Sequence, residues 1–242
     1  MAVRRVIKIA FFVVCGLVLV IGGGMFAMYK ASQQVPEFYR EALQVEPVKQ
    51  HEASDQMLQR ATTLASEVKQ EGKWKALFTA EQINGWLAVD LVENHPGALP
   101  RGISNPRVAI EPDRVMLACR ARRGELDSVV SLTVEPYLAE PNVMALRIRK
   151  ARAGLLPLPL DRVLSYISRA ANRLDLRLQW RQADGDPVAL VSLRQPRDRH
   201  DRFVRIEALQ LGESEVYLAG STEQRKSEHD DDQSGVNKNR QH

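Results

Sequence analysis

The chain has 242 residues, of which 44% are hydrophobic, and carries a formal net charge of +4 at pH 7. A sequence pI near 9.2 is only mildly basic, which is typical of a solvated surface; if the chain is exported, a partner for this charge would be anionic lipid or wall polymer rather than nucleic acid. Of the two cysteines only Cys119 lies outside the first apolar run. A fold held together by intramolecular disulfides is therefore excluded.

Residues 9–29 predict one transmembrane helix. The run contains no charged residue, and at about 1.5 Å of rise per residue it reaches roughly 30 Å, the thickness of the hydrocarbon core. The run is preceded by three cations, Arg4, Arg5 and Lys8, and followed closely by one, Lys30. This bias predicts that residues 1–8 form a short cytoplasmic tail and that the rest of the chain lies on the other side of the membrane. A cleaved signal peptide is the alternative, which the length of the run disfavours, because signal peptides carry about 7 to 15 apolar residues.

A helical stalk is expected over residues 31–77. Pro36 opens a short helix over 37–43, and a polar break over 46–52 separates it from a longer helix that starts near Ser54 and ends at Gly72. Apolar residues of the longer helix recur at steps of three and four, which predicts one buried stripe.

Residues 78–220 predict an exported α+β domain. Thr79 and Gln82 have the spacing of a capping box, so a helix is expected to start there and to end at His95-Pro96-Gly97. Further on, apolar residues alternate with polar ones, which predicts strands joined by short turns. The expected strands lie near 115–119, 130–134, 144–148, 174–180, 188–193, 204–211 and 215–218, with a helix over 160–174 between the third and the fourth.

These patterns predict the fold class. The domain is expected to be an antiparallel sheet packed against two or three helices, with Cys119 buried in its apolar face. Residues 221–242 are polar, mixed in charge and almost free of apolar side chains, so this tail is expected to be disordered.

A segment rich in leucine and proline, from Gly154 to Leu160, is the first candidate site. Its prolines hold the chain extended, and its leucines are either core residues or the lining of an apolar groove for an acyl chain. The opposite wall of such a groove would come from the earlier helix. The candidate groove residues are Trp86, Leu87, Leu155, Leu156, Leu158, Leu160, Leu164 and Ile167.

A basic cluster on one predicted strand is the second candidate site. Arg147, Arg149, Lys150 and Arg152 lie within six residues and could bind the phosphates of lipid headgroups or wall polymers. A solvated strand face is the alternative. The loop 197–202 mixes cations, carboxylates and a histidine, a pattern more typical of solvation than of chemistry.

No catalytic, cofactor-binding or metal-binding motif was found. The sequence contains no glycine-rich phosphate loop, no G-x-S-x-G, no H-E-x-x-H and no cysteine pairs with zinc spacing. Its five histidines, at 51, 95, 200, 229 and 242, are scattered. We therefore expect a protein that is not an enzyme and has no cofactor.

Three segments give the chain a family resemblance. Residues 78–84 (FTAEQIN), residues 154–159 (GLLPLP) with the helix after them, and the strand pair over 206–220 resemble the YpmS-like group of small bacterial proteins. That resemblance implies one N-terminal span and an exported α+β domain, and it supplies no functional residues.

Taken together, these features predict a single-pass protein of the bacterial cytoplasmic membrane. Its extracytoplasmic (periplasmic) domain is expected to be noncatalytic and to bind an apolar or amphipathic ligand such as lipid or an anionic envelope polymer. The alternative is an envelope assembly or scaffold protein that works through protein–protein contacts. No nucleic-acid partner is expected.

Overall fold

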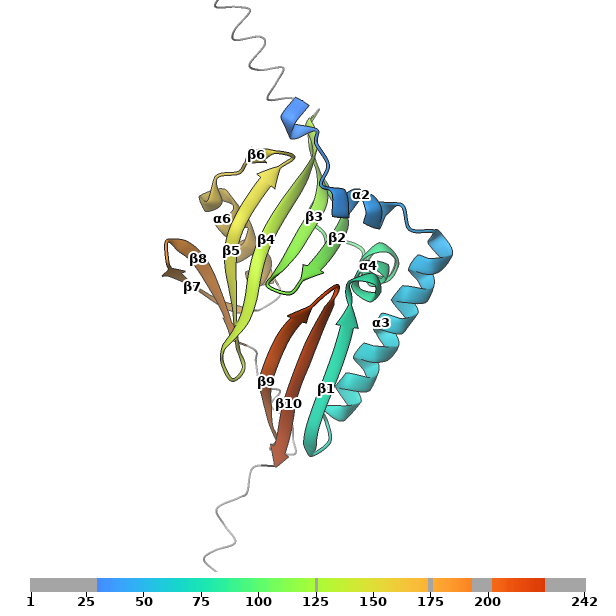
Figure 1. The fold of residues 1–242 in the computed structure, drawn as a ribbon, viewed down its shortest axis with the longest axis vertical. Helices are drawn as coiled ribbons and strands as arrows, with labels where there is room; N and C mark the ends of the chain where they lie inside the picture. The colour runs from blue at the N-terminus through green and yellow to red at the C-terminus, as the bar shows by residue number, and fades with distance from the viewer. Residues whose placement is uncertain (1–29, 125, 174–175, 193–201, 225–242) are drawn as a thin grey trace, which may run out of the picture.

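The fold is α+β with antiparallel strands and a few helices, as predicted, but the strands form two sheets where a single sheet was expected (Figure 1). The computed structural model describes residues 30–124, 126–173, 176–192 and 202–224. The helices are α2 (Glu37–Leu43), α3 (Pro47–Glu67), α4 (Ala80–Ala88), α5 (Asp90–Glu93) and α6 (Leu160–Arg173).

The larger sheet has the strand order β2-β3-β4-β5-β8-β7, with β6 paired to β5. Short turns join neighbouring strands, and the turn between β7 and β8 has positive φ at both Asp184 and Gly185, as a two-residue hairpin requires. The strands are β2 (Ile103–Glu111), β3 (Arg114–Arg123), β4 (Leu126–Glu140), β5 (Val143–Ala153), β6 (Leu156–Pro157), β7 (Arg177–Ala183) and β8 (Asp186–Ser192).

The smaller sheet has the order β1-β10-β9 and corrects two predicted boundaries. Its strands are β1 (Gly72–Thr79), β9 (Arg202–Gly212) and β10 (Glu215–Gln224). The stalk prediction is wrong for the residues of β1, which pair with β10. The predicted disorder is wrong for residues 221–224, which end β10: Thr222 is buried, and its hydroxyl donates to the Val68 carbonyl at 2.9 Å. The rest of the tail lies outside the described residues.

Helix α3 begins at Pro47, so the predicted polar break over 46–52 is wrong. Proline suits the first turn of a helix because the amide that it lacks has no partner there in any case. Gly85 then lets α4 approach α3 closely, since a methyl group at Gly85 would lie 2.6 Å from the Ser54 nitrogen and 2.8 Å from the Gln50 oxygen. The two helices therefore pack backbone against backbone.

The predicted capping box at the start of α4 is confirmed. The Gln82 amide donates to the Thr79 hydroxyl and the Thr79 amide donates to the Gln82 side chain, both at 3.2 Å. One turn later, the Asn84 side chain donates to the Val108 carbonyl and accepts from the Val108 amide, both at 2.8 Å. Asn84 thus takes the place of a neighbouring strand along the edge of β2.

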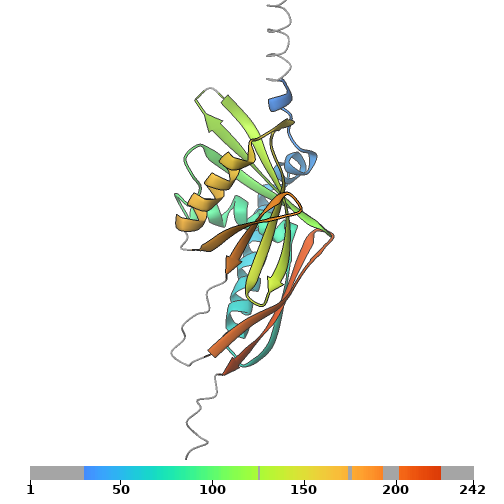
Figure 2. The same cartoon turned by 90° about the vertical axis from the view of Figure 1, so that its left-hand side faces the viewer.

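Helices α6 and α2 lie on opposite faces of the larger sheet (Figures 1 and 2). On the α6 face, the Trp180 indole donates to the Ser168 hydroxyl at 2.9 Å. On the α2 face, Tyr39 is buried against Ala118 and Val129. The predicted transmembrane segment, residues 9–29, lies outside the described residues. None of the helices in the described ranges is both long and apolar enough to cross a membrane.

Candidate functional site: an amphipathic trough

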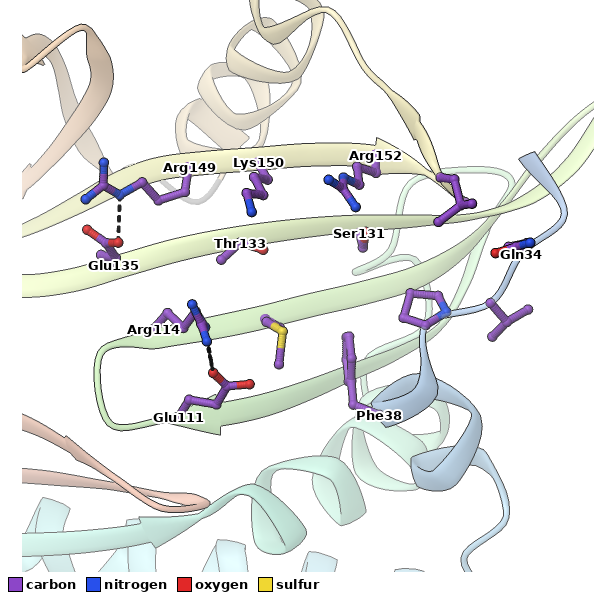
Figure 3. Close-up of a pocket in the computed structure, with 15 residues that line it drawn as sticks. Gln34, Phe38, Glu111, Arg114, Ser131, Thr133, Glu135, Arg149, Lys150 and Arg152 are labelled. Atoms are coloured by element: carbon purple, nitrogen blue, oxygen red, sulfur yellow. Dashed lines mark hydrogen bonds and ion pairs between the residues drawn. The ribbon is translucent and has the colours of Figure 1, made fainter. Parts of the chain in front are cut away.

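A hollow of about 690 Å³ opens on the α2 face of the larger sheet, and we call it the trough (Figure 3). Strands β3, β4 and β5 form its floor, and the chain before and within α2 forms one wall. Its apolar lining consists of Val35, Pro36, Phe38, Met116 and Leu155, with the backbone of Gly154. Its polar lining consists of Gln34, Glu111, Arg114, Ser131, Thr133, Glu135, Arg149, Lys150 and Arg152.

The chain that follows the predicted anchor is fixed to one end of the trough. The Leu155 amide donates to the Ala31 carbonyl at 2.9 Å, and the Gln33 side chain donates to the Asp127 carbonyl at 2.9 Å. Gly154 has φ +57°, and a methyl group there would lie 2.4 Å from the Ala31 oxygen. Glycine is therefore required for this close approach, which ties residues 30–35 to the ends of β4 and β5.

Burial of Tyr39 anchors α2 beside the trough. Its hydroxyl donates to the Asn105 carbonyl at 2.9 Å, and burial raises its pKa. On the next strand, Cys119 is half-buried rather than fully buried as expected, and burial raises the pKa of its thiol. Arg107 is buried nearby and donates to the Ala42 carbonyl at 3.3 Å, which satisfies the end of α2. Burial thus favours the neutral form of both groups, the phenol under α2 and the thiol on β3.

Two of the guanidinium groups in the trough are already paired with carboxylates. Arg114 contacts Glu111 through its Nε at 2.6 Å. Arg149 contacts Glu135 at 2.6 Å, and its other arm contacts Asp186. The hydrogen bond that Arg149 donates to Glu135, with the nearby charge of Asp186, raises the pKa of Arg149. These ion pairs link neighbouring strands of the sheet, and they largely neutralise Arg114 and Arg149, so these two side chains offer little charge to a ligand.

The structure divides the predicted anion-binding cluster in two. Arg147 does not line the trough: it is mostly buried and contacts Asp184 at 3.3 Å. Arg149 is paired as described above. Lys150 and Arg152 are exposed in the trough, and neither has an ion pair or a side-chain hydrogen bond with another described residue. Only these two members of the cluster are available to an anion.

Of the residues predicted to line an apolar groove, Leu155 alone lines one of the two hollows described here. Leu155 lines the trough with 51% of its surface exposed. The other residues line neither the trough nor the second hollow described below: Trp86 and Leu87 on α4, Leu156 on β6, Leu158 between β6 and α6, and Leu160, Leu164 and Ile167 on α6.

A second hollow of about 320 Å³ lies between α2, α3, α4 and β2. Phe38 lines both hollows, which therefore adjoin at this residue. Asn84 lines the second hollow, but its amide is used by Val108. The second hollow therefore adds volume beside the trough, and its lining also carries the charged residues Glu41, Lys49 and Glu81.

Sequence reasoning missed the floor and the inner wall of the trough. Ser131 and Thr133 alternate with the apolar residues of the strand predicted near 130–134, so they were the available signal for a polar floor. Phe38 was visible as part of a predicted helix, but nothing local indicated that this helix lies over the sheet. Of the loop 197–202, residues 197–201 lie outside the described part of the chain.

Among the residues that the structure describes, no group of three or more His, Cys, Asp or Glu side chains is arranged to hold a metal ion. The nearest approach to such a site is one pair, His95 Nε2 at 3.2 Å from Asp90 Oδ2. Asn94 also donates to Asp90 at 2.6 Å. Asp90 is buried, and these two contacts pair its carboxylate while they hold the residues that follow α5 in place.

Comparisons of the chain with protein-family models, with curated proteins and with solved structures find no match. The resemblance to the YpmS-like group therefore stays a prediction from its three segments. Function has to be argued from the geometry of the trough.

Proposed function

We propose that this chain is a membrane-tethered, noncatalytic domain that binds an amphipathic ligand, a lipid, in the trough. Its tether would be the predicted span over residues 9–29, which places the domain on the outer side of the cytoplasmic membrane. The observation that carries the proposal is the mixed lining of the trough, apolar beside α2 and cationic along β5.

The apolar side chains of the trough favour a ligand that covers them. Val35 is 42% exposed and Leu155 is 51% exposed, although both lie in a concave site of the size that ligand pockets have, about 300 to 1,000 Å³. Covering apolar surface releases water at roughly 25 cal/mol per Å². An acyl chain lying over these residues would thus gain binding free energy where a purely polar ligand would not.

The position of the trough favours a ligand from the membrane. Residues 34–36 line it, and Ala31 is hydrogen-bonded to Leu155 at its end. If residues 9–29 span the bilayer, only a few residues separate the trough from the membrane surface, so a lipid can reach it without crossing the aqueous compartment.

The test uses the full chain reconstituted in phosphatidylcholine vesicles that contain a lipid with a photoactivatable group near the end of its acyl chain. After irradiation, lipid adducts are mapped by peptide mass spectrometry. We expect adducts on peptides that contain Phe38, Met116 or Leu155, in addition to adducts on residues 9–29, which report simple exposure to the bilayer.

A pair of variants separates the trough from the surface in general. Each half-exposed side chain contributes about 1 kcal/mol when covered, so Val35→Gln with Leu155→Gln should lower the trough adducts roughly thirtyfold relative to the anchor adducts. Val92→Gln is the matched control, because Val92 is 59% exposed on α5 and lines neither hollow. A wild-type chain with adducts on the anchor alone would refute the proposal.

A further inference from the structure

The charges in the trough do not cancel. Its lining carries four cations, Arg114, Arg149, Lys150 and Arg152, against two carboxylates, Glu111 and Glu135. Arg114 and Arg149 are paired with those carboxylates. The excess positive charge therefore lies on Lys150 and Arg152, at the end of β5 nearest the chain that leaves the predicted anchor.

An irregularity in the pairing of β4 and β5 turns these cations into the trough. Thr133 is opposite Lys150 while Val134 is opposite Ile148, so Arg149 is an extra residue on β5. Side chains alternate across a regular strand, and one inserted residue reverses the alternation beyond it. Lys150 and Arg152 consequently project into the same hollow as Arg149 (Figure 3).

Two hydroxyl groups lie directly across from these cations. Thr133 is the cross-strand partner of Lys150, and Ser131 is the cross-strand partner of Arg152. Directly opposed residues have their Cβ atoms about 4.5 to 5.5 Å apart, so one ligand group can contact an ammonium or guanidinium group and a hydroxyl together. All four side chains line the trough.

This set of donors suits a phosphate ester. Two cations and two hydroxyls can donate to several oxygens of one tetrahedral anion, and Arg152 can do so with two parallel N–H groups. A zwitterionic headgroup would instead place its own cation beside Lys150 and Arg152, while the nearby carboxylates are occupied by Arg114 and Arg149.

Building on the proposed function, we propose that the trough selects an anionic phospholipid, whose headgroup phosphate contacts Lys150, Arg152, Ser131 and Thr133 while an acyl chain covers Leu155 and Phe38. The apolar half of the same hollow and its place beside the predicted anchor assign the phosphate to a membrane lipid. A free phosphate ion or a soluble anionic polymer would leave that half uncovered.

The test compares two photoactivatable lipids, phosphatidylglycerol and phosphatidylcholine with the same acyl chains, in vesicles that contain the full chain. The measurement is the ratio of trough adducts to anchor adducts for each headgroup. We expect wild type to favour phosphatidylglycerol, and Lys150→Gln with Arg152→Gln to lower that preference roughly 25-fold, since each cation near anionic lipid contributes about a fivefold factor.

Lys73→Gln with Lys75→Gln is the matched control. Both lysines are exposed, two residues apart on β1 of the smaller sheet, and removing them changes the net charge by the same amount. The control should keep the wild-type preference. Equal losses in the two double variants would mean that general charge attracts the lipid, and would overturn the inference.

The remaining outcomes separate this inference from the proposed function. Trough adducts that form equally with both headgroups would overturn the anionic selectivity and leave lipid binding intact. No trough adducts with either lipid would overturn both. Loss of the adducts when inorganic phosphate or soluble poly(glycerol phosphate) is added at constant ionic strength would overturn the assignment to a membrane lipid.

Discussion

Asn84 gives the sharpest test of how the fold is held together. Its side chain makes two hydrogen bonds of 2.8 Å to the amide and carbonyl of Val108. Val108 is 7% exposed on β2, which is an edge strand of the larger sheet. Substituting Asn84→Ala would leave both backbone groups without their partner under α4.

The expected cost follows from those two hydrogen bonds. Each is worth about 1 kcal/mol net, and a buried backbone group left without a partner costs about 1 to 3 kcal/mol. Because β2 lies at an edge, water can reach part of the vacated space. We therefore expect the free energy of unfolding to fall by about 2 to 4 kcal/mol, with Tm lower by roughly 2 to 4 °C per kcal/mol.

The assay has a global and a local readout on the full chain in detergent. Thermal unfolding measures the loss of stability, and amide hydrogen exchange measures the protection of the Val108 amide. Asn172→Ala is the matched control, because Asn172 is exposed on α6 and has no side-chain hydrogen bond with another described residue. If Asn84→Ala leaves Val108 protected and lowers Tm no more than the control, Asn84 does not act as a strand partner.

Three further variants and one change of pH test the packing of α3 against α4 and the charged groups of the larger sheet. Gly85→Ala should lower stability by about 1 to 3 kcal/mol in thermal unfolding, because contact with the backbone of α3 outweighs the gain in helix propensity of about 1 kcal/mol. Raising the pH above about 9 should also lower stability: burial raises the pKa values of Cys119 and Tyr39, so the unfolded chain releases these protons first. Arg149→Gln should lower the unfolding midpoint slightly, because it removes partly exposed ion pairs with Glu135 and Asp186, whereas Arg152→Gln should leave the unfolding midpoint within error of wild type.

Each of these expectations has an outcome that contradicts it. An increase in Tm for Gly85→Ala would mean that α3 and α4 separate without cost. A Tyr39→Phe, Cys119→Ala variant that loses stability above pH 9 as steeply as wild type would assign the alkaline loss to other groups. Equal destabilisation by Arg149→Gln and Arg152→Gln would mean that Arg152 has a structural role, and the trough variants would then need to be interpreted through folding.

Local interactions explain which elements could be predicted from sequence. The capping box at Thr79 and Gln82 joins residues three apart, and the apolar alternation of the strands follows from the period of a β-strand. The α+β class, the start of α4 and the hairpin at Asp184 and Gly185 all follow from such patterns. The ends of β1 and β10 did not, because Gly72 and Thr222 take their structure from pairing with each other across the chain.

The same contrast between local sequence patterns and long-range contacts is stronger at the functional site. The sequence by itself determined that Arg147, Arg149, Lys150 and Arg152 are close along one strand. Only the tertiary structure determined which of them remain available, because the carboxylates that pair with Arg147 and Arg149 come from β4, the turn between β7 and β8, and the first residue of β8. The pairing of β4 with β5 also leaves Arg149 as an extra residue on β5, and this irregularity directs Lys150 and Arg152 into the trough. Helix α2 forms the wall of the trough beside Lys150 and Arg152 because Tyr39 is buried against the sheet. A contact between residues so far apart in the chain leaves no periodic pattern in the sequence.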